Sequence, residues 1–357
     1  MDMNSLRDAF SGKRVFVTGH TGFKGSWLAF ILAEVGADVM GYALPPADGP
    51  SHFDLLHLSR HIAHRKGDIR DGAALESAMS EFRPEFVFHL AAQALVKESY
   101  ADPITTFDTN VMGSVHVLQA VRQTDSVRSF VYITSDKCYE NAEWVWGYRE
   151  SDRLGGRDPY SASKAAAEIV FSAYASSYLS GRPELGAATA RAGNVIGGGD
   201  WAIDRIVPDC VRAAGLDAAI QLRHPDATRP WQHVLEPLSG YLLLAARLRH
   251  EPQRFAGAWN FGPSSSEVRT VREVATTIME HLGRGRLEIL EAPPKLHEAN
   301  LLQLNCDKAH QNLEWYPRWT VDKALAETAE WYRATQGGAE PVVLTRKQVL
   351  DYFGGDV

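Results

Sequence analysis

A glycine-rich turn directly after a short apolar segment constrains the fold most strongly. Residues 14–18 (RVFVT) are typical of a buried β-strand, and residues 18–25 (TGHTGFKG) lead from them into a helix-like stretch, 26–35. Glycine permits the tight turn and a close approach of the backbone to a pyrophosphate, which the N–H groups and dipole of the helix N-terminus favour. The strand–turn–helix context predicts a dinucleotide-binding loop. Its expected contact residues are Gly19, Thr21, Gly22, Phe23, Lys24 and Gly25.

Strand-like and helix-like segments alternate through the first half of the chain. Further strands are expected at 38–42, 86–90 and 129–134, and helices at 71–83, 104–122 and 160–178. This alternation predicts an α/β fold with a Rossmann-type, doubly wound parallel sheet. Beyond about Gly193, segments rich in Gly and Pro separate shorter elements. We therefore expect an NAD-binding Rossmann domain at 1–192 that carries the catalytic residues. A smaller C-terminal α/β substrate lobe is expected at 193–357, with some segments returning to the first domain.

Charge and composition exclude several functional classes. The chain has 357 residues and a formal net charge of -7, which disfavours sequence-independent binding to nucleic acid. Its three cysteines, Cys138, Cys210 and Cys306, are widely spaced, which favours a reducing compartment. The first residues lack the apolar core of a signal peptide, and the best apolar run, 241–248, is too short to span a membrane. A cytoplasmic enzyme with no membrane partner is expected.

Two further segments fit the same dinucleotide site. Asp68 follows the expected third strand, where its carboxylate can accept a hydrogen bond from the adenine amino group; a simple turn residue is the alternative. The segment 89–93 (HLAAQ) ends the fourth strand with small residues that allow close approach of a cofactor. The segment 43–50 (ALPPADGP) carries no Arg or Lys for a ribose 2′-phosphate, which favours NAD over NADP. Alternatively, a distant cation such as Arg60 could bind a 2′-phosphate and allow NADP. Asp48 is a candidate for binding the ribose 2′-hydroxyl, with a simple turn residue as the alternative.

A Tyr-x-x-x-Lys pair begins one of the expected helices. Tyr160 and Lys164 are four residues apart, so both side chains lie on one helical face. A nearby ammonium and an oxidised nicotinamide would lower the pKa of a tyrosine and make it a usable base. Ser135 follows the apolar segment 129–134 directly and can donate a hydrogen bond to a substrate oxygen. Together these residues predict a hydroxyl–Tyr–Lys catalytic set.

Several motifs carry a resemblance to a known superfamily. They are TGHTGFKG, HLAAQ, TNVMGS, ITSDKCY, PYSASK, RAGNVIGGGDW and RPWQHVLEPLSGY. The chain resembles the extended short-chain dehydrogenases/reductases over nearly its whole length, and more narrowly the nucleotide-sugar 4,6-dehydratases. Most dehydratases of other nucleotide sugars carry Asp-Glu after the active hydroxyl, whereas this chain carries Asp136-Lys137, a version similar to the branch that acts on CDP-glucose. The resemblance implies further cofactor contacts from Asp68, Ile69, Leu90, Ala91, Ala92, Gln93 and Thr109, together with Tyr160 and Lys164.

The resemblance also implies a three-stage lyase reaction on CDP-glucose. Tyr160 removes the proton of the sugar 4-hydroxyl while NAD accepts a hydride from C4; Ser135 holds that oxygen, and Lys164 tunes Tyr160 and binds the nicotinamide ribose. The 4-ketone acidifies the C5 proton, which Lys137 removes, and Asp136 protonates the departing C6 hydroxyl before the hydride returns to C6. As a base, Lys137 must be neutral; the alternative is a charged lysine that pairs with Asp136 or orients the substrate. The product leads towards the dideoxysugars of lipopolysaccharide O-antigen.

Local cations and one aromatic residue are candidates for substrate recognition. Asn194 can donate to the phosphate region, and the forked guanidinium groups of Arg205, Arg229 and Arg223 suit a diphosphate, although surface ion pairs are the alternative. Trp231 can pack on the base or ribose, or serve only as a core residue. The expected substrate contacts are Gln93, Ser135, Asn194, Arg205, Arg229, Trp231 and His297, the last in a Pro-rich loop. The spacing of His57, His61 and His64 predicts a polar helix face, with no metal, and Cys138 is expected to be a packing residue.

Three other functions are weighed against the sequence. A nucleotide-sugar 4-epimerase also oxidises C4 but needs no acid/base pair for C6, so Asp136-Lys137 argues against it. A dehydratase acting on another nucleotide sugar is a further alternative. A protein that binds NAD without catalysis would have no use for Ser135, Tyr160 and Lys164. The resemblance implies a homodimer formed by the helices that contain residues 109–121 and 160–178, with a tetramer left open.

Overall fold

The computed structural model describes residues 1–264, 267–290 and 301–355. Its centre is a seven-stranded sheet in the order β11-β6-β5-β4-β1-β2-β3, and every neighbouring pair is parallel. The strand order reverses beside β1, and the carboxyl ends of the strands at such a point form the usual ligand crevice of doubly wound folds. The strands are β1 (Arg14–Thr18), β2 (Asp38–Ala43), β3 (Ala63–Lys66), β4 (Phe86–His89), β5 (Ser129–Ile133), β6 (Gly186–Ala192) and β11 (Gly257–Phe261). The predicted Rossmann-type fold is confirmed.

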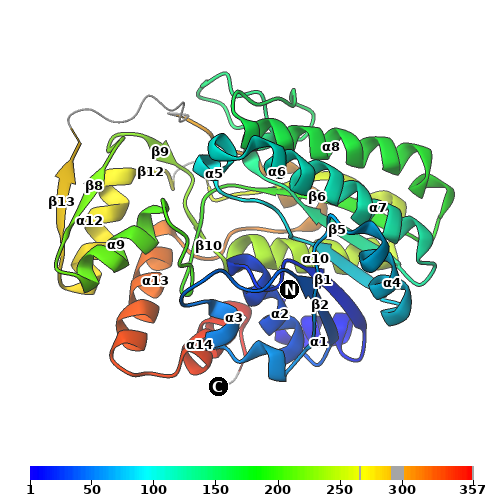
Figure 1. Ribbon diagram of the computed structural model, residues 1–357, viewed down its shortest axis with the longest axis horizontal. Helices are drawn as coiled ribbons and strands as arrows, with labels where there is room; N and C mark the ends of the chain where they lie inside the picture. Colours follow the sequence, from blue (N-terminus) through cyan, green and yellow to red (C-terminus); the bar gives the residue numbers. More distant parts are fainter. Residues whose placement is uncertain (265–266, 291–300, 356–357) are drawn as a thin grey trace.

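Helices cover both faces of this sheet, and each face has its own apolar core (Figure 1). Successive strand residues point to opposite faces, so Val15 and Val17 belong to one core and Phe16 to the other. The first face is covered mainly by α1 (Met3–Phe10), α2 (Phe23–Glu34), α10 (Leu235–His250) and α11 (Pro252–Phe255). The second carries α4 (Gly72–Phe82), α7 (Gly113–Gln123) and α8 (Pro159–Ser177), with η4 (Leu179–Gly181) after α8.

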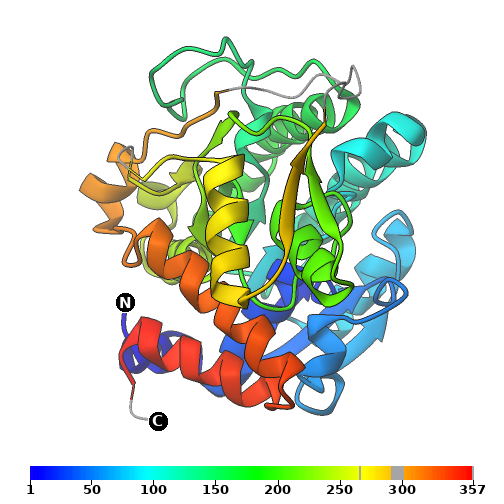
Figure 2. The ribbon, with the colours of Figure 1, turned by 90° about the vertical axis from the view of Figure 1, so that its left-hand side faces the viewer.

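A smaller lobe packs beside the carboxyl ends of the strands, around a third apolar core (Figure 2). Its helices are α9 (Ile206–Gly215), α12 (Val271–Leu282) and α13 (Val321–Gln336). Three two-stranded sheets accompany them, of which β10–β7 and β13–β8 are parallel and β12–β9 is antiparallel. These strands are β7 (Val195–Ile196), β8 (Ala219–Leu222), β9 (Thr228–Arg229), β10 (Gln232–His233), β12 (Arg269–Thr270) and β13 (Arg286–Ile289).

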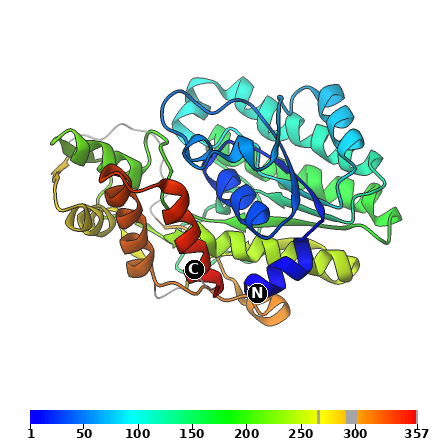
Figure 3. The ribbon, with the colours of Figure 1, turned by 90° about the horizontal axis from the view of Figure 1, so that it is seen from below.

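Late segments of the chain return to the sheet. Strand β11 pairs with β6, and α10 packs against β5 and β6. Helix α14 (Pro341–Phe353) ends next to α1 (Figure 3). Arg318 joins the two segments by donating to the Met1 and Tyr352 carbonyls. Within the described ranges no helix is both long and apolar enough to cross a membrane.

Two details of the predicted elements differ from the structure. The helix expected at 104–122 is divided into α6 (Pro103–Phe107), the π-helical turn η2 (Asp108–Met112) and α7. The predicted helical face of His57, His61 and His64 is wrong, because His57 has φ +50° before η1 (Leu58–Arg60), while His64 lies in β3. His64 Nδ1 instead lies 2.7 Å from His20 Nε2. The remaining short helices are α3 (His52–Leu55), α5 (Val96–Ala101), η3 (Asp136–Cys138) and η5 (Ala309–Leu313).

Candidate active site

The glycine loop is shaped for close backbone contacts. Gly19 has φ +75°, and a Cβ there would lie 2.6 Å from the Ala91 nitrogen. A Cβ on Gly25 would lie 2.1 Å from the Gly19 carbonyl oxygen, so only glycine allows this packing. Gly22 is the N-cap of α2 and offers no capping side chain, which leaves the first N–H groups of the helix available. An open helix N-terminus inside a tight glycine turn fits the pyrophosphate of a dinucleotide.

Gly25→Ala is expected to weaken NAD binding by about 10- to 100-fold, since an added methyl in a packed turn costs roughly 1–3 kcal/mol. Fluorescence titration with NAD measures the effect. Gly215→Ala is the matched control, because a Cβ at Gly215 meets nothing within 4 Å. Equal NAD affinity in Gly25→Ala and Gly215→Ala would contradict the role given to the loop.

Ser135, Tyr160 and Lys164 lie together at the carboxyl end of β5 and the start of α8. All three are buried, at 6%, 8% and 4% exposed. Burial raises the pKa of Tyr160 to about 12; a hydrogen bond with Ser135 and the charge of Arg205 favour the tyrosinate, while Asp136 opposes it. Burial lowers the pKa of Lys164 to about 8, and its Nζ lies 6.0 Å from the centre of the Tyr160 ring. Without cofactor the phenol is therefore a weak acid, and an added positive charge is needed to make it a base.

Asp136 is a buried carboxylate with one oxygen left without a partner. The residue is 1% exposed, and its Oδ1 accepts a hydrogen bond of 2.9 Å from the Ser135 hydroxyl. Lys137 Nζ lies 3.5 Å from the same oxygen, and the Lys137 side chain is 31% exposed. Oδ2 has no hydrogen-bond partner and faces Gly193, where a Cβ would lie 3.0 Å away. An unpaired buried oxygen is costly unless it meets a ligand or carries a proton, so Asp136 is suited to proton transfer.

Several positively charged side chains lie near the Asp136 carboxylate. Lys24, in the first turn of α2, is half-buried, and its ammonium makes no hydrogen bond or ion pair with any described residue. Burial, followed by the charge of Arg205, lowers the pKa of Lys24 to about 7; Asp136 opposes this, and Lys164 and Lys137 add to it. Because the charges of Asp136, Lys137 and Lys164 all act on Lys24, the glycine loop and the candidate catalytic residues influence one another electrostatically. Such an environment suits an anionic substrate.

The other predicted cofactor residues lie along the ends of β1 to β4. Thr21 donates to the Leu44 carbonyl at 2.9 Å, and the N–H groups of Leu90 and Ala91 reach the Thr18 hydroxyl at 3.2 Å. Asp68 accepts from the backbone and the guanidinium of Arg70, which holds the pKa of the carboxyl below its ordinary value. Ile69 is buried, while Phe23, Ala92 and Thr109 are half-buried. Their contacts with a cofactor stay predictions.

Gln93 is engaged by the protein itself. Its amide donates to the Leu95 carbonyl and to Thr106 Oγ1, and its oxygen accepts from the Leu95 N–H. Asn110, in the π-helical turn, accepts from the Gln93 N–H and donates to Ser163 on α8. The interrupted helix therefore aligns the loop after β4 with the catalytic helix.

The predicted substrate residues are spread over the smaller lobe. Asn194 has a buried Oδ1 without a partner, which suits a ligand contact. Arg205 forms an ion pair of 2.9 Å with Asp200, and Arg229 lies in β9, where its guanidinium donates to the Thr228 carbonyl. Trp231 is 5% exposed in the lobe's core and donates to the Arg269 carbonyl, so a stacking role stays a prediction. The prediction for His297 falls outside the described residues.

One buried ion pair beside the candidate site was not predicted from the sequence. Glu168 and Arg191 form a bidentate ion pair of 2.9 and 2.7 Å, with side chains only 3% and 4% exposed. Thr134 and Thr189 donate to the same carboxylate, and its charge raises the pKa of Lys164, countering the effect of burial. Glu168 follows Lys164 by four residues, and that spacing was the available signal. The pair joins α8 to β6 and to the end of β5, next in sequence to the candidate catalytic residue Ser135.

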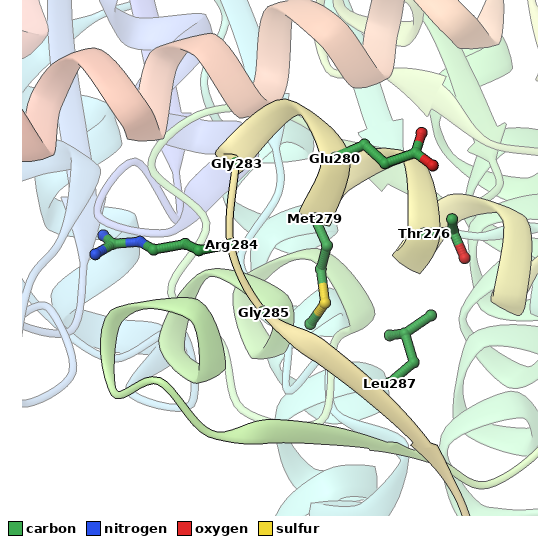
Figure 4. A pocket seen from close by; sticks show the side chains of 7 residues that line it. All are labelled: Thr276, Met279, Glu280, Gly283, Arg284, Gly285 and Leu287. Carbon is green, nitrogen blue, oxygen red and sulfur yellow. The ribbon is translucent and has the colours of Figure 1, made fainter.

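Two surface hollows lie elsewhere. One, of about 350 Å³, is lined by residues of α12, the following turn and β13, including Met279, Arg284 and Leu287 (Figure 4). The other is lined by Arg83, Glu85, Asp125, Ser126, Arg128 and Arg249. Neither contains a predicted site residue. In the part of the chain that the structure describes, no group of three or more His, Cys, Asp or Glu residues is placed to hold a metal ion.

The fold and the hydroxyl–Tyr–Lys site define an extended short-chain dehydrogenase/reductase, and comparisons with known proteins narrow this class. The family profile of GDP-mannose 4,6-dehydratase matches residues 16–328. The chain belongs to this family of nucleotide-sugar 4,6-dehydratases. A CDP-glucose 4,6-dehydratase from Salmonella typhimurium is 46% identical over 351 residues, which cover 97% of this chain and 98% of that protein.

Solved structures agree on the fold. An epimerase from Methanothermobacter thermautotrophicus has a TM-score of 0.80 and 25% identity, with 97% of both chains covered. The UDP-glucose 4-epimerase of Thermus thermophilus, solved in complex with NAD, has a TM-score of 0.75 and 27% identity, with 90% of this chain and 99% of that chain covered.

Proposed function

We propose that the protein catalyses the NAD-dependent dehydration of CDP-glucose to CDP-4-keto-6-deoxyglucose. The observation that carries the proposal is the 46% identity to a CDP-glucose 4,6-dehydratase over 97% of the chain. The buried Ser135, Asp136, Tyr160 and Lys164, together with Lys137, supply the groups that this reaction needs. The open glycine loop and the NAD complex of the Thermus thermophilus relative support NAD as the cofactor.

The proposed roles follow from the local contacts. NAD, held by the glycine loop and Lys164, would supply the redox chemistry, as the acceptor of a hydride from C4 and its donor to C6. Ser135 positions the 4-oxygen, and Tyr160, whose interaction with Ser135 favours the tyrosinate, removes the proton of that hydroxyl. Asp136 delivers a proton to the C6 hydroxyl that leaves as water, and its unpaired Oδ2 is the atom available for this. Lys137 takes the C5 proton, exchanges it with solvent, and returns a proton to C5 as the hydride adds to C6. The cations Lys24, Arg205 and Lys164 keep the site attractive to a diphosphate.

The test is incubation with CDP-glucose and NAD in deuterated water, followed by mass spectrometry and NMR. Loss of one water with deuterium at C5 is the expected result. If CDP-glucose stays unchanged while a UDP, GDP or dTDP sugar is dehydrated, the protein is a dehydratase of that other nucleotide sugar. A product with inverted C4 and no loss of water would favour the epimerase, and NAD binding without any turnover would favour a non-catalytic protein.

Asp136→Asn is expected to lower the dehydration rate by about 100-fold, because an amide cannot protonate the leaving hydroxyl. Oxidation at C4 should continue, so reduced cofactor accumulates in a single turnover and can be followed by its absorbance. Asp226→Asn, at a position whose side chain is 82% exposed, is the control. A parallel loss of oxidation and elimination would contradict the role given to Asp136.

Lys137 is tested separately. Lys137→Ala should stop deuterium exchange at C5 if the amine is the base. Near-normal elimination with weaker substrate binding would instead show a charged lysine that orients the substrate and pairs with Asp136 at 3.5 Å.

The remaining parts of the proposal concern assembly and location. Exposed apolar side chains on α6, η2 and α8, namely Ile104 at 81%, Phe107 at 39%, Met112 at 47% and Ile169 at 58%, support a homodimer through these helices, with a tetramer as the alternative. Three buried free cysteines support a reducing, cytoplasmic location. The same proposal includes an NAD-binding domain at residues 1–192 and a substrate lobe at residues 193–357. It also includes a reaction that precedes the formation of dideoxysugars for O-antigen.

A further inference from the structure

Two cations from different parts of the fold converge on Asp204. Lys97 Nζ donates to Asp204 Oδ1 at 2.8 Å, and a guanidinium nitrogen of Arg223 lies 3.6 Å from the same oxygen. Lys97 is on α5, which follows β4 of the large sheet, whereas Arg223 follows β8 in the smaller lobe. Asp204 belongs to the loop before α9. Figure 1 shows α5 on the side of the sheet that faces α9 and β8.

This junction lies at the edge of the candidate active site. Asp204 immediately precedes Arg205, and the charge of Arg205 acts on both Tyr160 and Lys24. A nucleotide sugar whose C4 lies beside Tyr160 must place its diphosphate a few bonds away, between the two lobes. The junction is therefore within the region that a diphosphate would occupy.

The ion pairs at the junction are suited to exchange. The side chains of Lys97, Asp204 and Arg223 are 49%, 32% and 26% exposed, and ion pairs exposed to this degree contribute little to stability. A carboxylate brings one negative charge, whereas a diphosphate brings two and offers more acceptor oxygens in charge-assisted hydrogen bonds. A diphosphate should therefore displace the carboxylate from both cations.

We propose that Lys97 and Arg223 bind the diphosphate of the substrate, and that Asp204 occupies their ammonium and guanidinium groups in its absence. Lys97 is then a substrate-binding residue contributed by helix α5, and the carboxylate of Asp204 competes with the substrate. The inference rests on the proposed function for the identity of the nucleotide sugar.

The test is the binding of CDP and of inorganic pyrophosphate to the NAD-loaded enzyme, measured by calorimetry. Lys97→Ala should raise both dissociation constants about tenfold and raise KM for CDP-glucose similarly, with kcat changed by no more than about twofold. Asp204→Asn should lower both dissociation constants about threefold. Asn is chosen because Asp204 has φ +63°, a backbone conformation that Asn also tolerates.

Lys13→Ala is the matched control. Its ammonium lies 3.7 Å from Glu85 at the opposite end of β1, and its side chain is 41% exposed, close to the value for Lys97. CDP binding by Lys97→Ala equal to that by Lys13→Ala would overturn the proposal. The proposal would also be overturned if Asp204→Asn bound CDP more weakly, as Lys97→Ala does. That result would show that the ion pair holds the two lobes together and does not compete with the substrate. A protein that leaves CDP-glucose unchanged, but binds pyrophosphate more weakly after Lys97→Ala, would contradict the proposed function alone.

Discussion

Tyr160→Phe is expected to lower kcat for CDP-glucose by about 1,000-fold, because general base catalysis contributes roughly 10²- to 10⁴-fold and phenylalanine has no group to accept the proton. Burial raises the pKa of this phenol to about 12 when no cofactor charge is present. In the NAD-loaded enzyme the pKa should be lower, since a cation nearby favours the tyrosinate. The rate of C4 oxidation should therefore rise with pH until Tyr160 is ionised. Rapid-mixing measurement of reduced cofactor across pH checks both statements.

Two comparisons make this result specific. Tyr174→Phe removes a hydroxyl from the same helix, where the Tyr174 ring packs against Tyr178, and should leave kcat unchanged. The residual activity of Tyr160→Phe should lose the pH dependence assigned to the phenol. An unaltered pH profile in Tyr160→Phe would show that another group removes the proton of the 4-hydroxyl.

Glu168→Ala should destabilise the protein by about 3–5 kcal/mol, because it leaves the guanidinium of Arg191 buried without its ionic partner. Arg191 also donates to the Tyr139 hydroxyl at 2.7 Å, and Tyr139 in turn donates to Asn260 on β11, so the effect should extend across the edge of the sheet. Urea unfolding measures the loss. The double variant Glu168→Leu with Arg191→Met should lose less than Glu168→Ala, since it removes both charges together.

A solvent-exposed ion pair serves as the control for the buried Glu168–Arg191 pair. Glu330 and Arg333 form an ion pair on α13 with side chains 50% and 60% exposed, so Glu330→Ala should cost no more than about 0.5 kcal/mol. A similar cost for Glu330→Ala and Glu168→Ala would show that the buried pair does not stabilise α8 against the sheet.

Local sequence patterns were enough to predict strands β1, β2, β4 and β5 and the candidate site residues Ser135, Tyr160 and Lys164, whereas strands β6 and β11 were not predicted. The apolar run of β1 and the glycines after it specify a strand–turn–helix unit, because Gly19 adopts a φ of +75° in the turn and Gly25 packs against the Gly19 carbonyl oxygen. The close approach of Gly19 to Ala91, by contrast, joins distant segments. The position of Ser135 after β5, and the spacing of Tyr160 and Lys164 on α8, likewise depend on neighbouring residues. Predictions of this kind need only periodicity and turn chemistry.

Contacts between distant segments could not be predicted in this way. The ion pair between Lys97 and Asp204 joins residues 107 positions apart, and nothing in either local sequence indicates the other. Helical spacing predicted that His57, His61 and His64 share one helix face, but His64 lies in β3, where it pairs with a residue of β2. The π-helical turn inside 104–122 contains Asn110, whose hydrogen-bond partners Gln93 and Ser163 come from other elements and are not indicated by the local sequence.

The late return of β11 has a consequence for biosynthesis on the ribosome. Every residue of β6 is buried, and one edge of this strand is completed only by residues 257–261, while α10 covers β5 and β6 from residues 235–250. A nascent chain that ends near residue 192 therefore exposes an unpaired apolar strand edge, which is a template for aggregation. The seven-stranded sheet is therefore completed only after residue 261 has been translated, so the segments before and after residue 192 are expected to fold together.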